Sequence, residues 1–145
     1  GFLLWNRPPA RIFMGDAGSY GLGAMFAVFL VAGAAGVGTA WLVAMLTGVF
    51  ICDATLTLLA RVLRGERFHE AHRQHAYQRM VQCGWSHGRV LAVFTLINLL
   101  WCWPLAALSL FEPDLGPVIT TLCFAGLCGL WLAAQHHYAA HAQAS

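Results

Sequence analysis

The chain of 145 residues is 59% hydrophobic and only 10% charged. Soluble domains carry a charge on about a quarter of their residues, so this composition excludes an ordinary soluble domain and predicts an integral membrane protein. The formal net charge of +2 gives no reason to expect a nucleic-acid partner.

The chain opens on an apolar run, residues 1–5, with no initiator Met and no signal-peptide layout. This run is too short to cross a bilayer. We therefore expect it to be the end of a helix that starts upstream, and the chain to be the C-terminal part of a longer polytopic protein.

The segment that follows places a carboxylate in a turn between glycines, directly before a long apolar stretch. Asp16 lies between Gly15 and Gly18, and Ser19 comes next. The glycines let the backbone approach a ligand closely, and Ser19 is expected to cap the next helix, whose free N–H groups attract an anion. An ionisable group at a membrane edge is costly, and its expected partner is a cation. The pattern predicts a site for a metal-bound phosphate.

Four apolar segments follow, near residues 20–35, 40–60, 90–110 and 118–135. A helix needs about 20 such residues to span the hydrocarbon core, and the first segment is the shortest. The sequence thus predicts an all-α, polytopic transmembrane bundle with about four spans in this chain.

Charge is distributed unevenly among the connections between these segments. Six arginines lie within residues 61–89, whereas the connection at 36–39 is uncharged and the one at 111–117 carries only acids. By the positive-inside rule, the N-terminal segment 5–19, the loop 61–89 and the C-terminal tail are cytoplasmic. Asp16 and the histidines of the loop are then expected on one side.

Residues 64–80, within the loop 61–89, form the one long polar stretch of the sequence. On a helix, His72 and His75 would share a face that Arg79 continues. Arginine offers fork-shaped contacts to phosphate, and histidine offers a donor that can carry charge. The alternative is a basic juxtamembrane loop that binds anionic lipid headgroups and fixes topology, and the clustering of histidines favours a site.

A zinc site is not expected. The pattern His69-Glu70 would need a second imidazole at position 73, which is Arg73. His72 and His75 lack a close third ligand. The five cysteines show no C-x-x-C spacing and are interpreted as small core residues.

Asp53 lies inside the second predicted span, with Thr55 and Thr57 nearby. Two readings are open, a carboxylate that lines a cytoplasm-facing cavity or a buried acid bonded to a neighbouring helix, and we favour the second.

Taken together, residues 1–6, including Asn6, and residues 9–19 closely resemble a signature of the polyprenyl-phosphate N-acetylhexosamine-1-phosphate transferases. This bacterial family includes the enzymes that start peptidoglycan lipid and O-antigen synthesis. Residues 53–59, 72–78 and 85–87 look like its O-antigen branch. The resemblance covers nearly all of the chain and implies that residues 1–145 form the C-terminal part of one integral membrane transferase domain.

The resemblance implies transfer of a sugar 1-phosphate, of the N-acetylhexosamine type, from a UDP-N-acetyl sugar to undecaprenyl phosphate. UMP is released, and Mg²⁺, or alternatively Mn²⁺, is required. The reaction would start O-antigen or another surface glycan on the cytoplasmic side of the bacterial inner membrane, among its lipids. No particular oligomeric state is implied. Asp16 would be the catalytic metal ligand, and the substrate-binding residues would be Asn6, Gly18, Ser19, His72, His75 and Arg79.

One departure from the family pattern limits what the chain could do alone. The family's adjacent aspartate pair and its asparagine-rich nucleotide loop do not occur within residues 1–145. They are expected upstream, so this chain by itself is expected to be inactive.

A transporter or channel fragment is the main alternative, with a cation or proton path through Asp16, Asp53 and the histidines. Such a path would need charged residues in several spans, and only Asp53 is clearly inside one. A structural membrane scaffold is a third reading.

Overall fold

The computed structural model describes residues 5–6, 14–34, 39–66 and 74–144. Within these ranges every regular element is helical, which confirms the predicted all-α class. The elements are α2 (Gly15–Ala34), α3 (Thr39–Leu46), α4 (Gly48–Leu63), α5 (Ala76–Gln82), α6 (His87–Ile97), the π-helix η1 (Asn98–Cys102), α7 (Trp103–Phe111), the 3-10 helix η2 (Pro113–Leu115) and α8 (Gly116–Ala144).

Two helical stretches are long and apolar enough to cross a membrane, His87–Phe111 and Pro113–Ala140. They contain the third and fourth predicted spans. The second predicted span corresponds to α3 and α4, which together have the required length but meet at an angle of 66°. The first predicted span lies in α2, whose apolar part, Ala17–Gly33, is shorter than a full span. Of the four expected spans, two therefore fall in helices that are long and apolar enough to cross a membrane, and a third falls in a bent helix pair.

The break between α3 and α4 falls at Thr47 and Gly48. The Thr47 hydroxyl donates a hydrogen bond to the carbonyl oxygen of Val43 at 2.7 Å. A Cβ at Gly48 would lie 3.1 Å from the Cδ1 atom of Leu127, so the glycine allows α4 to approach α8 closely. Beyond the bend, α4, the more polar helix of the pair, packs against α8.

The core lies where α3, α4, α7 and α8 meet. Its most deeply buried side chains include Met45, Cys102 and Cys123. All five cysteines are free thiols, and Cys52 is buried as well, which agrees with their interpretation as core residues. Cys83 is the exception, because it is half-buried outside this cluster.

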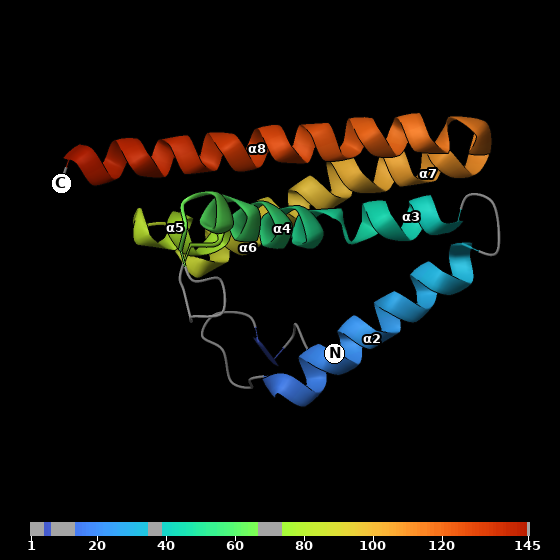
Figure 1. Ribbon diagram of the computed structural model, residues 1–145, viewed down its shortest axis with the longest axis horizontal. Coiled ribbons are helices and arrows are strands. Elements are labelled where there is room, and N and C mark those ends of the chain that lie inside the picture. The colour runs from blue at the N-terminus through green and yellow to red at the C-terminus, as the bar shows by residue number, and fades with distance from the viewer. Residues whose placement is uncertain (1–4, 7–13, 35–38, 67–73, 145) are drawn as a thin grey trace.

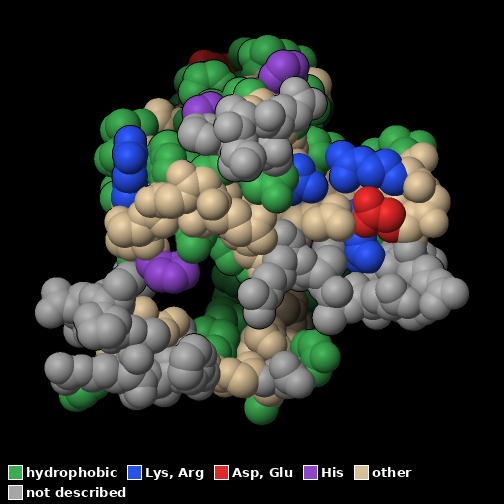
Figure 2. Space-filling view, turned by 90° about the vertical axis from the view of Figure 1, so that its left-hand side faces the viewer, with side chains coloured by type: hydrophobic (Ala, Val, Ile, Leu, Met, Phe, Trp, Pro, Cys, Tyr) green, Lys and Arg blue, Asp and Glu red, His purple; other side chains and the backbone are tan. Residues whose placement is uncertain are grey.

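Figure 1 shows α4, α6, α7 and α8 running along the long axis of the molecule, while α2 slopes away and approaches the others at α3. One end, where α4 and α8 finish and α5 and α6 begin, carries the arginines. We call it the basic end, after Arg61, Arg64, Arg79 and Arg89. Figure 2 looks onto this end and shows arginine and histidine side chains spread across it. The opposite end carries Glu112 and Asp114, so the charge asymmetry of the sequence is also one of the structure.

Candidate functional site

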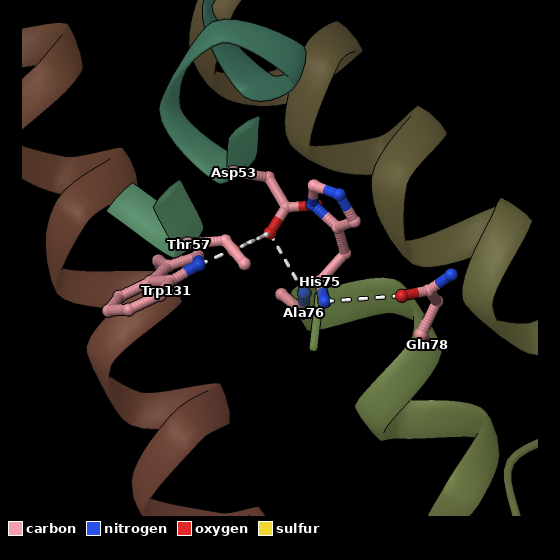
Figure 3. A network of polar contacts seen from close by, with 6 residues as sticks. All are labelled: Asp53, Thr57, His75, Ala76, Gln78 and Trp131. Atoms are coloured by element: carbon pink, nitrogen blue, oxygen red, sulfur yellow. Dashed lines mark hydrogen bonds and ion pairs between the residues drawn. The ribbon is translucent and has the colours of Figure 1, made fainter. Parts of the chain in front are cut away.

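A buried carboxylate, that of Asp53 in α4, organises the basic end. The residue is 8% exposed. The Oδ1 atom accepts hydrogen bonds from the backbone N–H of Ala76 at 2.8 Å, from the indole Nε1 of Trp131 at 3.1 Å and from the hydroxyl of Thr57 at 3.4 Å. The Oδ2 atom lies 3.3 Å from Nδ1 of His75. Figure 3 shows these groups converging from α4, α5 and α8. The favoured reading, a buried acid bonded to neighbouring helices, is confirmed.

Local sequence explains part of this arrangement. Asp53 and Thr57 are four residues apart on one helix and therefore share a face. Ala76 is the first residue of α5, where a backbone N–H has no partner inside the helix. Asp53 supplies the missing acceptor, and its negative charge suits the positive end of the helix. The N–H of His75 donates to Oε1 of Gln78 at 3.3 Å, which fixes the start of α5 a second time.

A second acid, Glu66, joins the residues on either side of the segment 67–73. Its Oε2 atom accepts a hydrogen bond from Nε2 of Gln74 at 2.8 Å and forms an ion pair with Nε of Arg61 at 3.1 Å. Arg61 is only 4% exposed. The hydrogen bond from Gln74, followed by that from Arg61, holds the pKa of Glu66 below its ordinary value.

Arg79 in α5 lies against α8. Its guanidinium carbon sits 4.7 Å from the ring centroid of Tyr138, in a cation–π contact. Burial, with repulsion from Arg64, lowers the pKa of Arg79 from its ordinary high value. The described residues offer this guanidinium no carboxylate within ion-pair distance. A half-buried cation of this kind is suited to an external anion.

A cavity of about 250 Å³ opens beside these groups, between α4, α5, α6 and α8. Its lining is nearly all apolar, with Asp53, Arg79, His137 and Tyr138 among the exceptions. Asp53 therefore also lines a cavity, as its first reading had proposed.

The structure brings together only some of the predicted site residues. His75 and Arg79 both lie at the basic end, whereas His72 is outside the described residues. The prediction that His75 lies on a helical face with His72 and Arg79 is wrong, because His75 precedes the helix. Because Asp53 accepts the N–H of Ala76, α5 starts there, and His75 keeps an extended backbone with ψ of 149°.

The turn around Asp16 is helical from Gly15 onward. Gly15 has φ of +67°, a conformation that favours glycine, and Asp16 is in the first turn of α2. The prediction that Ser19 caps this helix is wrong, because α2 begins four residues earlier and Ser19 lies inside it. Gly18 leaves room for the side chain of Met14, and Asn6 is half-buried. The side chain of Asp16 is outside the described residues.

Sequence reasoning missed Trp131, Tyr138 and Glu66. Trp131 is 78 residues from the acid that it bonds, and no local pattern connects the two. The available signal was the shortage of hydrogen-bond donors around Asp53 in a predicted span, since a buried carboxylate must find donors on other helices.

Parts of the chain are similar to known proteins. A family model described as Glycosyl transferase family 4 matches residues 1–34.

A protein named phospho-N-acetylmuramoyl-pentapeptide-transferase from Carboxydothermus hydrogenoformans is 36% identical over 104 residues, which are 69% of this chain and 30% of the relative. Its namesake in Clostridioides difficile is 31% identical over 107 residues, 71% of this chain and 31% of the relative. The namesake in Bifidobacterium animalis subsp. lactis is 29% identical over 142 residues, 94% of this chain and 32% of the relative. No solved structure matches. The chain thus spans about 30% of the length of these curated relatives.

Proposed function

We propose that this chain is part of an enzyme of glycosyl transferase family 4, which transfers a sugar 1-phosphate from a nucleotide sugar to a polyprenyl phosphate within a membrane. The family match over residues 1–34, which includes the turn of Asp16, carries this proposal. The named transferases among the relatives and the apolar helices support it.

Asp16 is proposed as the metal ligand. Its carboxylate belongs to the first turn of α2, where negative groups and free backbone N–H groups occur together. Among the described residues no three His, Cys, Asp or Glu side chains are grouped to hold a metal ion. A single carboxylate such as that of Asp16 suits Mg²⁺, or alternatively Mn²⁺, because Mg²⁺ takes one or two protein carboxylates and fills its remaining positions with phosphate oxygens and water. When bound, the ion would neutralise charge on the transferring phosphate.

His75 and Arg79 are proposed to bind the diphosphate of the UDP-sugar. Arg79 offers a planar fork of donors and has no described carboxylate to compete for it. His75 adjoins the start of α5 at the same end of the bundle. His72, Asn6, Gly18 and Ser19 are proposed to complete the substrate contacts. The basic end would face the cytoplasm at the inner membrane.

The donor and acceptor are proposed to be a UDP-N-acetyl sugar and undecaprenyl phosphate. Resemblance over residues 53–59 and 72–78 favours a simple UDP-N-acetylhexosamine and an O-antigen or related surface glycan. The names of the relatives favour a muramoyl-pentapeptide donor. Parallel assays with both donors distinguish the two.

The test uses the full-length protein in membranes, with undecaprenyl phosphate and each donor, and measures UMP release with and without Mg²⁺. Asp16→Asn should abolish Mg²⁺-dependent release and leave membrane insertion intact. Asp114→Asn, an exposed acid at the opposite end, is the matched control and should release UMP normally. Near-normal turnover by Asp16→Asn would refute the role of Asp16.

The transport alternative is less well supported. Asp53, the acid inside a predicted span, has its carboxylate occupied by donors from its own helix and from neighbouring helices. Ion flux through proteoliposomes in the absence of any UDP-sugar would reverse this preference.

A further inference from the structure

We infer that Asp53 and Trp131 are positioning residues for His75, so that helix α8 sets the orientation of an imidazole in the candidate site. This inference rests on the proposed function, because it concerns how His75 meets the nucleotide-sugar. It adds to that function a pair of residues that do not themselves touch substrate.

Among the described residues, Asp53 and Tyr77 contact the ring of His75. Its Nδ1 atom lies 3.3 Å from Oδ2 of Asp53, and its face stacks on Tyr77 with ring centroids 5.8 Å apart and an interplanar angle of 16°. A hydrogen bond at one ring nitrogen decides which tautomer the neutral imidazole adopts. Because Nδ1 faces Oδ2 of Asp53, Nε2 is the nitrogen directed away from the carboxylate (Figure 3).

The carboxylate can hold the imidazole only if it is itself held. Its Oδ1 atom receives three donors, from Ala76, Trp131 and Thr57. Thr57 is in the same helix as Asp53, and Ala76 is next to His75 in the chain. Neither donor therefore holds the carboxylate to a third part of the structure. Trp131 belongs to α8, and its indole N–H at 3.1 Å is the donor that ties the carboxylate to a separate long helix.

The loss of the Trp131 donor would therefore act at a distance. A buried carboxylate that loses one donor is free to rotate toward the remaining ones, and the Oδ2 contact to His75 rotates with it. His75 has its own backbone bond to Gln78, so the start of α5 should persist while the ring changes orientation.

The test combines kinetics with ¹⁵N-histidine NMR on the full-length protein. Trp131→Phe removes the indole N–H together with part of the ring, and Asp53→Asn keeps the shape of the side chain but not its charge. The matched control is Trp101→Phe, because that indole also donates a hydrogen bond, to the carbonyl oxygen of Cys123 at 3.2 Å, but away from Asp53. The His75 signals are assigned from their absence in His75→Gln.

The expected result is a change in the relative Nδ1 and Nε2 shifts of His75 in both Trp131→Phe and Asp53→Asn, with no change in Trp101→Phe. UMP release should lose about tenfold in kcat/KM for the UDP-sugar, the size of one hydrogen bond to a charged group. The loss should appear mainly in KM. If Trp131→Phe does not fold, Thr57→Val removes another Oδ1 donor at nearly constant shape and should change the same signals.

Unchanged His75 shifts in the folded donor variants would overturn the inference, and so would equal losses in Trp101→Phe and Trp131→Phe. If instead the shifts change as expected while the unmodified enzyme releases no UMP from any donor, the proposed function fails and the positioning by Asp53 and Trp131 stands.

Discussion

The basic end and helix α2 carry the two halves of the candidate site, but they are built differently. At the basic end, Asp53 and Glu66 each bind donors from other parts of the chain. Helix α2 packs against α3 and leaves large apolar side chains exposed, with Tyr20 and Val31 each at 75%. Hydropathy is enough to define α2, whereas the basic end depends on polar contacts between helices. The difference predicts that substitutions at the two regions will have very different effects on stability.

The largest effect is expected from Asp53→Ala. This substitution leaves the buried N–H groups of Ala76 and Trp131 without their acceptor, and because each unsatisfied donor costs about 1–3 kcal/mol, the total loss should be about 3 kcal/mol. Thermal unfolding of the purified full-length protein in detergent measures the loss. Asp114→Ala, at an exposed acid of the opposite end, is the control and should unfold at the original temperature. Equal melting temperatures for the two variants would contradict the network around Asp53.

A smaller effect is expected from adding a single methyl group to a glycine in each region. A Cβ at Gly126 in α8 would lie 2.6 Å from Cζ2 of Trp101, whose indole is held by a hydrogen bond to the carbonyl oxygen of Cys123. Gly126→Ala should therefore destabilise the protein by about 1–3 kcal/mol through overpacking.

Gly21 in α2 is the matched position. No atom of the described residues lies within 4 Å of a Cβ added there. Gly21→Ala should be neutral or stabilising by about 1 kcal/mol at most, because alanine favours a helix over glycine. Melting temperatures that fall by similar amounts in both variants would show that α2 is as closely packed as α8.

The smallest effect concerns acid and the Glu66 contact. Because Gln74 and Arg61 lower the folded-state pKa of Glu66, its stabilising contribution is present above the ordinary glutamate pKa of about 4.3 and is lost as the pH falls through the folded value. Glu66→Gln should flatten the decline of the melting temperature on the acid side of pH 4.3. Identical acid profiles for the variant and the original protein would show that Glu66 does not contribute through its charge.

Long uninterrupted apolar runs explain what could be predicted from the sequence. The spans expected at 90–110 and 118–135 lie inside His87–Phe111 and Pro113–Ala140, since about 20 apolar residues have few alternatives to a helix in a membrane. The second predicted span is bent near Gly48, which packs closely on Leu127. The sequence did not predict this bend, because the packing is a tertiary contact that no local pattern reveals.

The candidate site was predictable by residue type rather than by geometry. The sequence identified His75 and Arg79 as donors and Asp53 as an acid in need of partners. It placed His75 inside a helix, because spacing alone does not reveal that an acid on another helix accepts the first N–H of α5. It placed Ser19 at a helix end for a similar reason, since the positive φ of Gly15 starts α2 earlier.

The most direct test of the central claim is the sidedness of the Asp16 turn and of the loop that carries His75. In the full-length protein without native cysteines, Met14→Cys and Gln82→Cys report the two segments, and Asp114→Cys reports the opposite end. A membrane-impermeant maleimide should label the first two only in inverted vesicles and the third only in right-side-out spheroplasts. Labelling of Met14→Cys and Gln82→Cys from opposite faces of the membrane would contradict a shared site for the metal ion and the diphosphate.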